Sequence, residues 1–335
     1  MSAAVGAAVA PPRRRPIEAL AGTARRNTWT FALLGLLAVV LVVTRLIQPN
    51  YGAPQIQGLA ISVLPIALAA VAQGIVVISG GIDLSVGSMM ALTSVSSAVL
   101  MNGQSEETGV LVVVGILLMG VVLGAINGAL VVATRVPDIV VTLAMSFVWA
   151  GAALLVLSTP GGGAAQWLTG LISGSIGSEW IPNALVVLAV VVGVIWIPIR
   201  NTTVGLSLYA IGSNPLAAFR SGVPVGRTKI VAYTLTGLFS ALGGLALTAS
   251  TGIGAPVPGS YTLQSVAAIV LGGVSLAGGR GGLVGPIVAC FVLALVRTDM
   301  TFLGVNPNLS TALQGAILIG VVMFGSLIAM RRIRG

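Results

Sequence analysis

Long uninterrupted runs of apolar residues make up most of the chain, and short groups of polar, glycine and proline residues separate them. The runs do not alternate between apolar and polar positions, so they predict helices and not strands. A run of about 20 apolar residues is long enough to cross a hydrocarbon layer of about 30 Å. We therefore predict ten membrane-spanning helices, with the third and eighth short for a full crossing. Their ranges are 28–47, 58–78, 86–102, 109–134, 139–157, 182–199, 228–250, 262–277, 283–303 and 309–330.

Composition and charge agree with this pattern. Hydrophobic residues make up 56% of the 335 positions and charged residues 7%, whereas a soluble domain has about 25% charged residues. When the helices are threaded with the first residue inside, all but Arg45 and Arg297 of the 16 basic residues fall on the inner side. The positive-inside rule then places both termini in the cytoplasm. The net charge of +9 is a topology signal and not a nucleic-acid patch.

The domain organisation is simple. Residues 1–27 are rich in Ala, Pro and Arg and predict a disordered cytoplasmic tail. Residues 28–335 form one transmembrane domain, whose longest inner loop covers 200–227.

Several kinds of chemistry are excluded by residue type. The chain has no histidine and a single cysteine, Cys290, so it offers neither a Cys/His metal cluster nor a histidine-based catalytic triad. Its only lysine, Lys229, follows Thr228 and does not belong to a phosphate-binding loop. We therefore expect a protein that is not an enzyme.

A break between the second and third predicted helices holds a single carboxylate. Gly80 and Gly81 permit a turn there, and Asp83 can accept hydrogen bonds from the Ser85 and Val86 amides and so cap the next helix. Alternatively the break borders a permeation path, because irregular backbone at membrane depth survives only where protein or water covers it. The two interpretations are compatible.

The next two helices carry further polar signals. Asn127 stands among glycines spaced for close helix packing, at 120, 124 and 128, and either bonds across that contact or faces a solute. Pro137 suits a first helical turn, and Asp138 suits the positive end of a helix dipole. We interpret both as structural.

The inner loop encodes a short helix over 215–221. Asn214 suits its cap, Pro215 its first position and Gly222 its left-handed end, and Pro224 prevents continuation. A helix in a connecting loop suggests a docking element for a cytoplasmic partner, and the alternative is a helix that rests on lipid headgroups.

The two halves of the chain carry matching breaks. Glycine-rich segments at 80–87 and 252–259 each precede a short predicted helix. The second to fifth predicted helices form one group of four and the seventh to tenth another, and the two groups would have opposite orientation. This arrangement is typical of transporters built from inverted repeats.

The chain also resembles a known family, the permease subunit of ribose-type sugar ABC importers. The resemblance extends from about residue 49 to residue 327. Its motifs are Gly80-Gly-Ile-Asp-Leu-Ser-Val-Gly-Ser88, Asn127-Gly128, Ile139-Val-Val-Thr-Leu143, Ala210-Ile-Gly-Ser-Asn214 and Val270-Leu-Gly-Gly-Val-Ser-Leu-Ala-Gly-Gly-Arg-Gly282.

The resemblance implies an all-α fold similar to the ten-helix cobalamin-importer permease. It implies a bacterial inner-membrane protein that works with a cytoplasmic ABC ATPase, a periplasmic sugar-binding protein and a second permease, either a homodimer partner or a sister chain. ATP and Mg would be bound by the ATPase, and this chain would hold no cofactor. The residues implied for ATPase coupling are Gly212, Asn214, Ala217, Ala218, Arg220, Ser221 and Gly222. Those we assign to the helix break and translocation path are Gly80, Gly81, Asp83, Ser85, Gly87, Asn127 and Thr142.

The expected function is ATP-driven import of a monosaccharide. The alternatives are another small polar solute, such as a nucleoside, a polyol or a furanosyl signal, and an ion-coupled secondary transporter. The last would need buried titratable groups, and the candidates Asp83, Asp138 and Asp299 all lie near predicted helix ends.

Overall fold

A computed structural model describes residues 28–257, 259–306, 308–310, 312–313, 315–316 and 320. The predicted tail (1–27) and most of the tenth predicted helix (309–330) lie outside the described residues. Within them the protein is helical, and no β-strand forms beyond two isolated bridges.

Among the described residues, seven helical segments are long and apolar enough to cross a membrane. One of them is composite, because α8 (Asn183–Val191) continues through a π-helical turn (Val192–Trp196) into α9 (Ile197–Arg200). The other six are α2 (Thr28–Ile47), α3 (Ala53–Ile78), α5 (Glu106–Thr134), α6 (Asp138–Val156), α12 (Val225–Thr251) and α14 (Val284–Phe302).

Five shorter helices complete the described chain. They are α4 (Val86–Met101), α7 (Gln166–Ile172), α10 (Thr203–Ser213), α11 (Pro215–Arg220) and α13 (Tyr261–Leu271). The nine helices predicted between residues 28 and 303 are all present, with α4 and α13 short as expected. The sequence analysis missed α7 and α10, and a total of ten spans stays a prediction.

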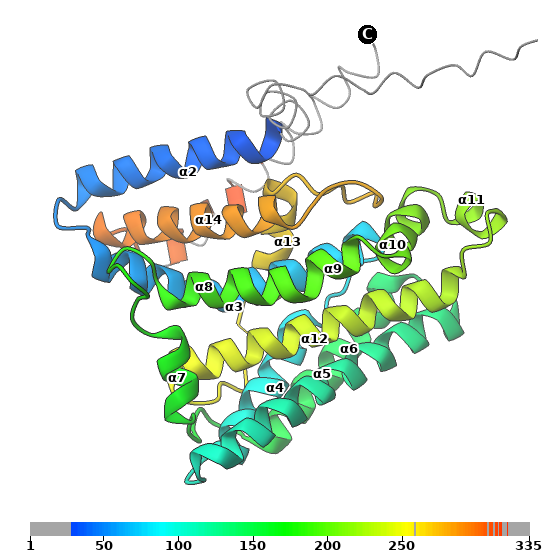
Figure 1. Ribbon diagram of the computed structural model, residues 1–335, viewed down its shortest axis with the longest axis horizontal. Coiled ribbons are helices and arrows are strands. Elements are labelled where there is room, and N and C mark those ends of the chain that lie inside the picture. Colours follow the sequence, from blue (N-terminus) through cyan, green and yellow to red (C-terminus); the bar gives the residue numbers. More distant parts are fainter. Residues whose placement is uncertain are drawn as a thin grey trace, which may run out of the picture.

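The long helices lie side by side with α7 at one end of the bundle and α10 and α11 at the other (Figure 1). We call these the α7 end and the α11 end. The most apolar stretch of α3 is 83% buried, whereas those of α2 and α6 are 11% buried. Helix α3 therefore forms the centre of the bundle, and α2 and α6 present apolar side chains to the surrounding lipid.

Close contact between α5 and α12 depends on glycine. A Cβ atom at Gly124 would meet the Tyr233 carbonyl and the Gly237 backbone, and one at Gly120 would also meet Gly237. Small residues at this spacing let two backbones approach in a membrane, where lipid gives no hydrophobic drive for association. The packing interpretation of these glycines is confirmed.

Helix α4 is held against α12 by hydroxyl groups. The Thr248 hydroxyl lies 2.8 Å from that of Ser94 and 3.1 Å from that of Ser97, and all three side chains are fully buried. These hydrogen bonds hold the short helix α4 against α12 inside the bundle.

Candidate transport site

The chain reverses direction immediately after α3. Gly80 takes a left-handed conformation with φ of +85°, and a Cβ on Gly81 would collide with the Asp138 carboxylate and the Tyr233 hydroxyl. Only glycine fits both requirements without strain. The segment between α3 and α4 therefore turns back into the bundle as irregular backbone, as the sequence predicted.

Asp83 lies in this segment and is completely buried. Its Oδ1 atom accepts hydrogen bonds from the Ser85 amide at 2.8 Å and the Ser85 hydroxyl at 2.6 Å. The predicted bond from the Val86 amide is not among its contacts, and Ser85 is the residue at the cap position of α4. Asp83 therefore stabilises the turn before α4 and does not cap the helix as predicted. The second oxygen, Oδ2, is buried without a partner among the described residues.

Asn127 extends the contacts of Asp83 to two more helices. Its Nδ2 donates to the Ser85 hydroxyl at 2.7 Å, and its Oδ1 accepts from the Trp149 indole at 3.2 Å. A chain of hydrogen bonds thus joins the break, α5 and α6. Asn127 thus bonds between helices, as one interpretation expected, but toward the break and α6 and not across the glycine contact with α12.

Thr142 of α6 fixes the other side of the break. Its hydroxyl accepts from the Leu84 amide at 3.1 Å and lies 3.1 Å from the Ile82 carbonyl. Together with Gly87, all the residues assigned to the first break fall in one region between α3, α4, α5 and α6.

A residue of the second half completes this region. Thr262, in the first turn of α13, accepts from the Gly87 amide at 3.0 Å and lies 3.4 Å from the Leu84 carbonyl. Helices α4 and α13 therefore begin at the same place inside the bundle and run to opposite ends, α4 toward the α7 end and α13 toward the α11 end. The sequence signal for Thr262 was the second glycine-rich break, but nothing in it showed that the two breaks touch.

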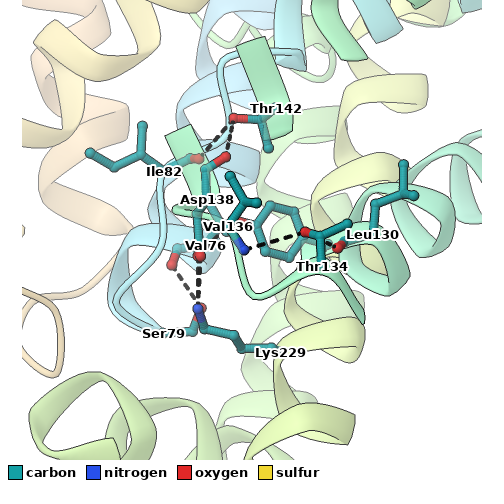
Figure 2. A network of polar contacts seen from close by, with 10 residues as sticks. Val76, Ser79, Ile82, Leu130, Thr134, Val136, Asp138, Thr142 and Lys229 are labelled. Carbon is teal, nitrogen blue, oxygen red and sulfur yellow. Dashed lines mark hydrogen bonds and ion pairs between the residues drawn. The ribbon is translucent and has the colours of Figure 1, made fainter. Parts of the chain in front are cut away.

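An ion pair lies beside the first break on the α11 side. The Lys229 ammonium lies 2.9 Å and 3.0 Å from the two carboxylate oxygens of Asp138, and the Tyr233 hydroxyl donates to the same carboxylate at 3.0 Å. Figure 2 shows Lys229 reaching Asp138 next to the turn that contains Ser79 and Ile82. The sequence analysis missed this pair. It assigned Asp138 to the helix dipole and named it among the titratable candidates near predicted helix ends. The sequence did contain an indication of the ion pair. The only lysine of the chain lies near the start of one helix, and an isolated aspartate begins another helix at the same end of the bundle.

The residue types around the break limit the chemistry that is possible there. No group of three or more potential metal ligands occurs in the part of the chain that the structure describes. Two carboxylates border the break: Asp83, which is held by Ser85, and Asp138, which is paired with Lys229.

Comparisons with known proteins identify the chain. A family model described as "Branched-chain amino acid transport system / permease component" matches residues 55–322. The autoinducer 2 import system permease protein LsrD of Escherichia coli K12 is 30% identical over 321 residues, which cover 92% of this chain and 94% of that protein. LsrD of Shigella flexneri matches equally well. The chain belongs to this permease family. No solved structure matches it.

Membership confirms the resemblance to ribose-type ABC importer permeases, which are transport subunits and not enzymes. It directs attention to the predicted coupling segment at the α11 end. There the Ala217 amide donates to Asn214 Oδ1 at 3.0 Å, and Gly222 adopts φ of +85° at the other end. The permease thus carries the short capped helix that its sequence predicts, over Pro215–Arg220.

The coupling residues do not all share one surface. Asn214, Ala217, Arg220, Ser221 and Gly222 are exposed. Ala218 is buried, and Gly212 is also buried, because α10 packs there against the Ile78 carbonyl and Gly279.

Two apolar residues that the sequence analysis omitted dominate the exposed face of α11. Leu216 is 58% exposed and Phe219 68% exposed. The sequence indicated them only as a pair of apolar residues inside a short helix that lies outside the predicted spans.

Helix α10 connects α11 to the break. Burial raises the pKa of Tyr209, so its hydroxyl stays protonated and donates to the Gly281 carbonyl at 2.9 Å. The Gly279 amide in turn donates to the Ile78 carbonyl at 2.9 Å. Contacts of α10 therefore link the segment next to α11 with the end of α3, directly before the break.

Proposed function

We propose that this permease imports a small neutral sugar, driven by ATP hydrolysis in a separate ABC ATPase. The observation that carries the proposal is the match to an import-system permease over nearly the whole chain. We further propose that it lies in the bacterial inner membrane with the α11 end and both termini in the cytoplasm. The distribution of basic residues supports this orientation.

The ATPase would bind at α11. Exposed Leu216 and Phe219 are unusual on a helix outside the spans and suit an apolar cleft in a protein partner. Arg220 at the end of the same helix adds a charge for orientation. ATP and Mg would be held by that partner.

The solute would pass the region where α4 and α13 begin. Discontinuous helices that meet inside a bundle are how transporters expose backbone groups to a solute. Asp83 would have a structural role there, because its Oδ1 is already occupied by Ser85. We expect a periplasmic binding protein to select the solute and a second permease, identical or related, to complete the path.

The solute class is a sugar or a close relative. LsrD is a permease of an autoinducer 2 import system, so autoinducer 2 is one candidate here, beside other furanosyl signals. A nucleoside or polyol would use the same hydrogen-bonding chemistry.

The experiment is uptake into proteoliposomes that contain the permease. The ATPase and the binding protein that accompany it are supplied together or omitted one at a time, and labelled D-ribose, autoinducer 2, adenosine and ribitol are compared. We expect uptake of one sugar-like compound that stops when either partner is omitted. Uptake of none of the four compounds by the complete system would contradict the proposed solute class.

A further inference from the structure

A cavity of about 470 Å³ lies between α3, α13 and α14, away from the break itself. Small-molecule sites have volumes of about 300–1,000 Å³, so the space accommodates one compact solute. Six polar or aromatic side chains reach it from three elements: Ser62, Ser260, Tyr261, Gln264, Arg297 and Thr298.

The cavity lies in the half of the bundle nearest the α7 end. Thr298 stands four residues before the end of α14 at Phe302 and Cys290 twelve residues before it, so the lining on α14 runs from about 6 Å to about 18 Å below that end at 1.5 Å per residue. Arg297 is one of the two basic residues that the positive-inside pattern leaves on the outer side.

The polar lining offers both donors and acceptors. Ser62 and Thr298 give their hydroxyl protons to the carbonyls of Leu59 and Ala294, at 2.9 Å and 3.0 Å, which leaves their oxygens as acceptors toward the cavity. The guanidinium of Arg297 supplies up to five N–H donors.

No carboxylate in the described part of the chain forms an ion pair with Arg297, since the one ion pair there joins Lys229 and Asp138. No acidic side chain lines the cavity either. A charged residue at membrane depth usually marks a functional site.

Helix α13 links the cavity wall to the place where the two short helices begin. Tyr261 lines the cavity, and the next residue, Thr262, bonds Gly87 and Leu84 of the first break. The cavity and the break are therefore connected by consecutive residues of α13.

We propose that this cavity is a binding site for one neutral, hydroxyl-rich solute, entered from the α7 end. Arg297 donates to solute oxygens, Ser62 and Thr298 accept from solute hydroxyls, and the Tyr261 ring covers an apolar face of the sugar. The proposal rests on the proposed function and adds the place where the permease itself holds its solute.

The first test replaces Arg297 in the reconstituted complex. A charge-assisted hydrogen bond contributes about 1.5–3 kcal/mol, so Arg297→Gln should lower uptake of the transported sugar by about tenfold or more. Arg297→Lys should not restore it, because a lysine lacks the planar fork of donors. Arg45→Gln, at the end of α2, is the matched control and should stay within about twofold of wild type.

If Arg297→Lys and Arg297→Gln both transport like wild type, Arg297 only extends to lipid headgroups and the proposal is wrong. A loss of uptake by Arg297→Gln that disappears when the vesicles are made without anionic phospholipid would assign Arg297 to a lipid phosphate. That result would also overturn the proposal.

The second test asks whether water and sugar reach the cavity. In a Cys290→Ala background, Thr298→Cys should react with a charged, membrane-impermeant thiol reagent added to intact cells, and the transported sugar should slow the reaction. Val122→Cys, whose parent side chain is 55% exposed on the outer surface of α5, should stay unlabelled in lipid. Thr298→Cys labelling as slow as that of Val122→Cys would contradict the proposal. So would labelling of Ala294→Cys, at a lining residue with no assigned solute contact, that the sugar does not slow.

The two proposals fail separately. Wild-type protein that transports none of the four compounds contradicts the proposed solute class. Normal wild-type uptake with an unreactive Thr298→Cys contradicts only the cavity.

Discussion

Asp83 is completely buried, and its Oδ1 atom accepts from the amide and hydroxyl of Ser85 in the turn before α4. Replacement by alanine leaves the amide and hydroxyl of Ser85 without their acceptor, which costs about 1–3 kcal/mol. Asp83→Asn retains an acceptor oxygen and should lose much less. Thermal unfolding of the purified permease in detergent measures both variants, and equal losses would show that the negative charge, and not the hydrogen bonds to Ser85, is what stabilises the fold.

The Asp138–Lys229 pair should stabilise the contact between α6 and α12. Both side chains are mostly shielded, with 14% and 26% exposed, so we expect a coupling of about 1 kcal/mol, at the upper limit for partly exposed pairs. A double-mutant cycle with Asp138→Asn and Lys229→Met measures it by unfolding in detergent. Additive effects of the two substitutions would contradict the prediction.

Single residues were predictable from sequence where the backbone demanded them. The left-handed turn at Gly80 and the cap at Asn214 both follow from local geometry, and both are confirmed. The Lys229–Asp138 contact could not be predicted, because it joins residues 91 positions apart. A local role for each residue already explained its position in the sequence.

Among the helices, α5 and α12 make the contact most sensitive to side-chain size. Gly124→Ala would push a methyl group into the α12 backbone, and such overpacking costs about 1–3 kcal/mol or more. Gly115→Ala in the same helix meets nothing within 4 Å and should be neutral or stabilising by about 1 kcal/mol. Detergent unfolding compares the two, and equal stability would contradict the packing account.

Helix α11 gives a direct prediction for assembly. Phe219→Asp should abolish co-purification of the ATPase, because it places a charge on the exposed apolar face, whereas Phe219→Leu should retain the complex. Ala218→Asp is unsuitable for this purpose, since Ala218 is buried and its loss would disturb packing. An intact complex with Phe219→Asp would place the ATPase elsewhere.

Helix ends were predicted well where glycine, proline or asparagine marks them, as at α4 and α11. Helices α7 and α10 were missed because they lie inside segments interpreted as loops, and α10 is apolar but only 11 residues long. A run of this length does not distinguish a short buried helix from a loop with apolar anchors.

At the scale of the whole molecule, the sequence predicted two matching breaks but not their contact. The proximity of Gly87 and Thr262 depends on how α3 and α12 place the two segments, and a separation of 175 residues leaves no local signal. The same holds for the cavity, whose walls come from α3, α13 and α14. Family membership, by contrast, was readable from the motifs alone.

We expect ATP hydrolysis by a partner to drive solute uptake and Asp83 to have a structural role only. The most direct measurement compares wild type and Asp83→Asn in proteoliposomes, once with both partners and ATP, and once with imposed proton or sodium gradients alone. The account predicts ATP-driven uptake by both proteins and none under the gradients. Gradient-driven uptake by wild type that Asp83→Asn abolishes would contradict it and would make Asp83 the ion-coupling group.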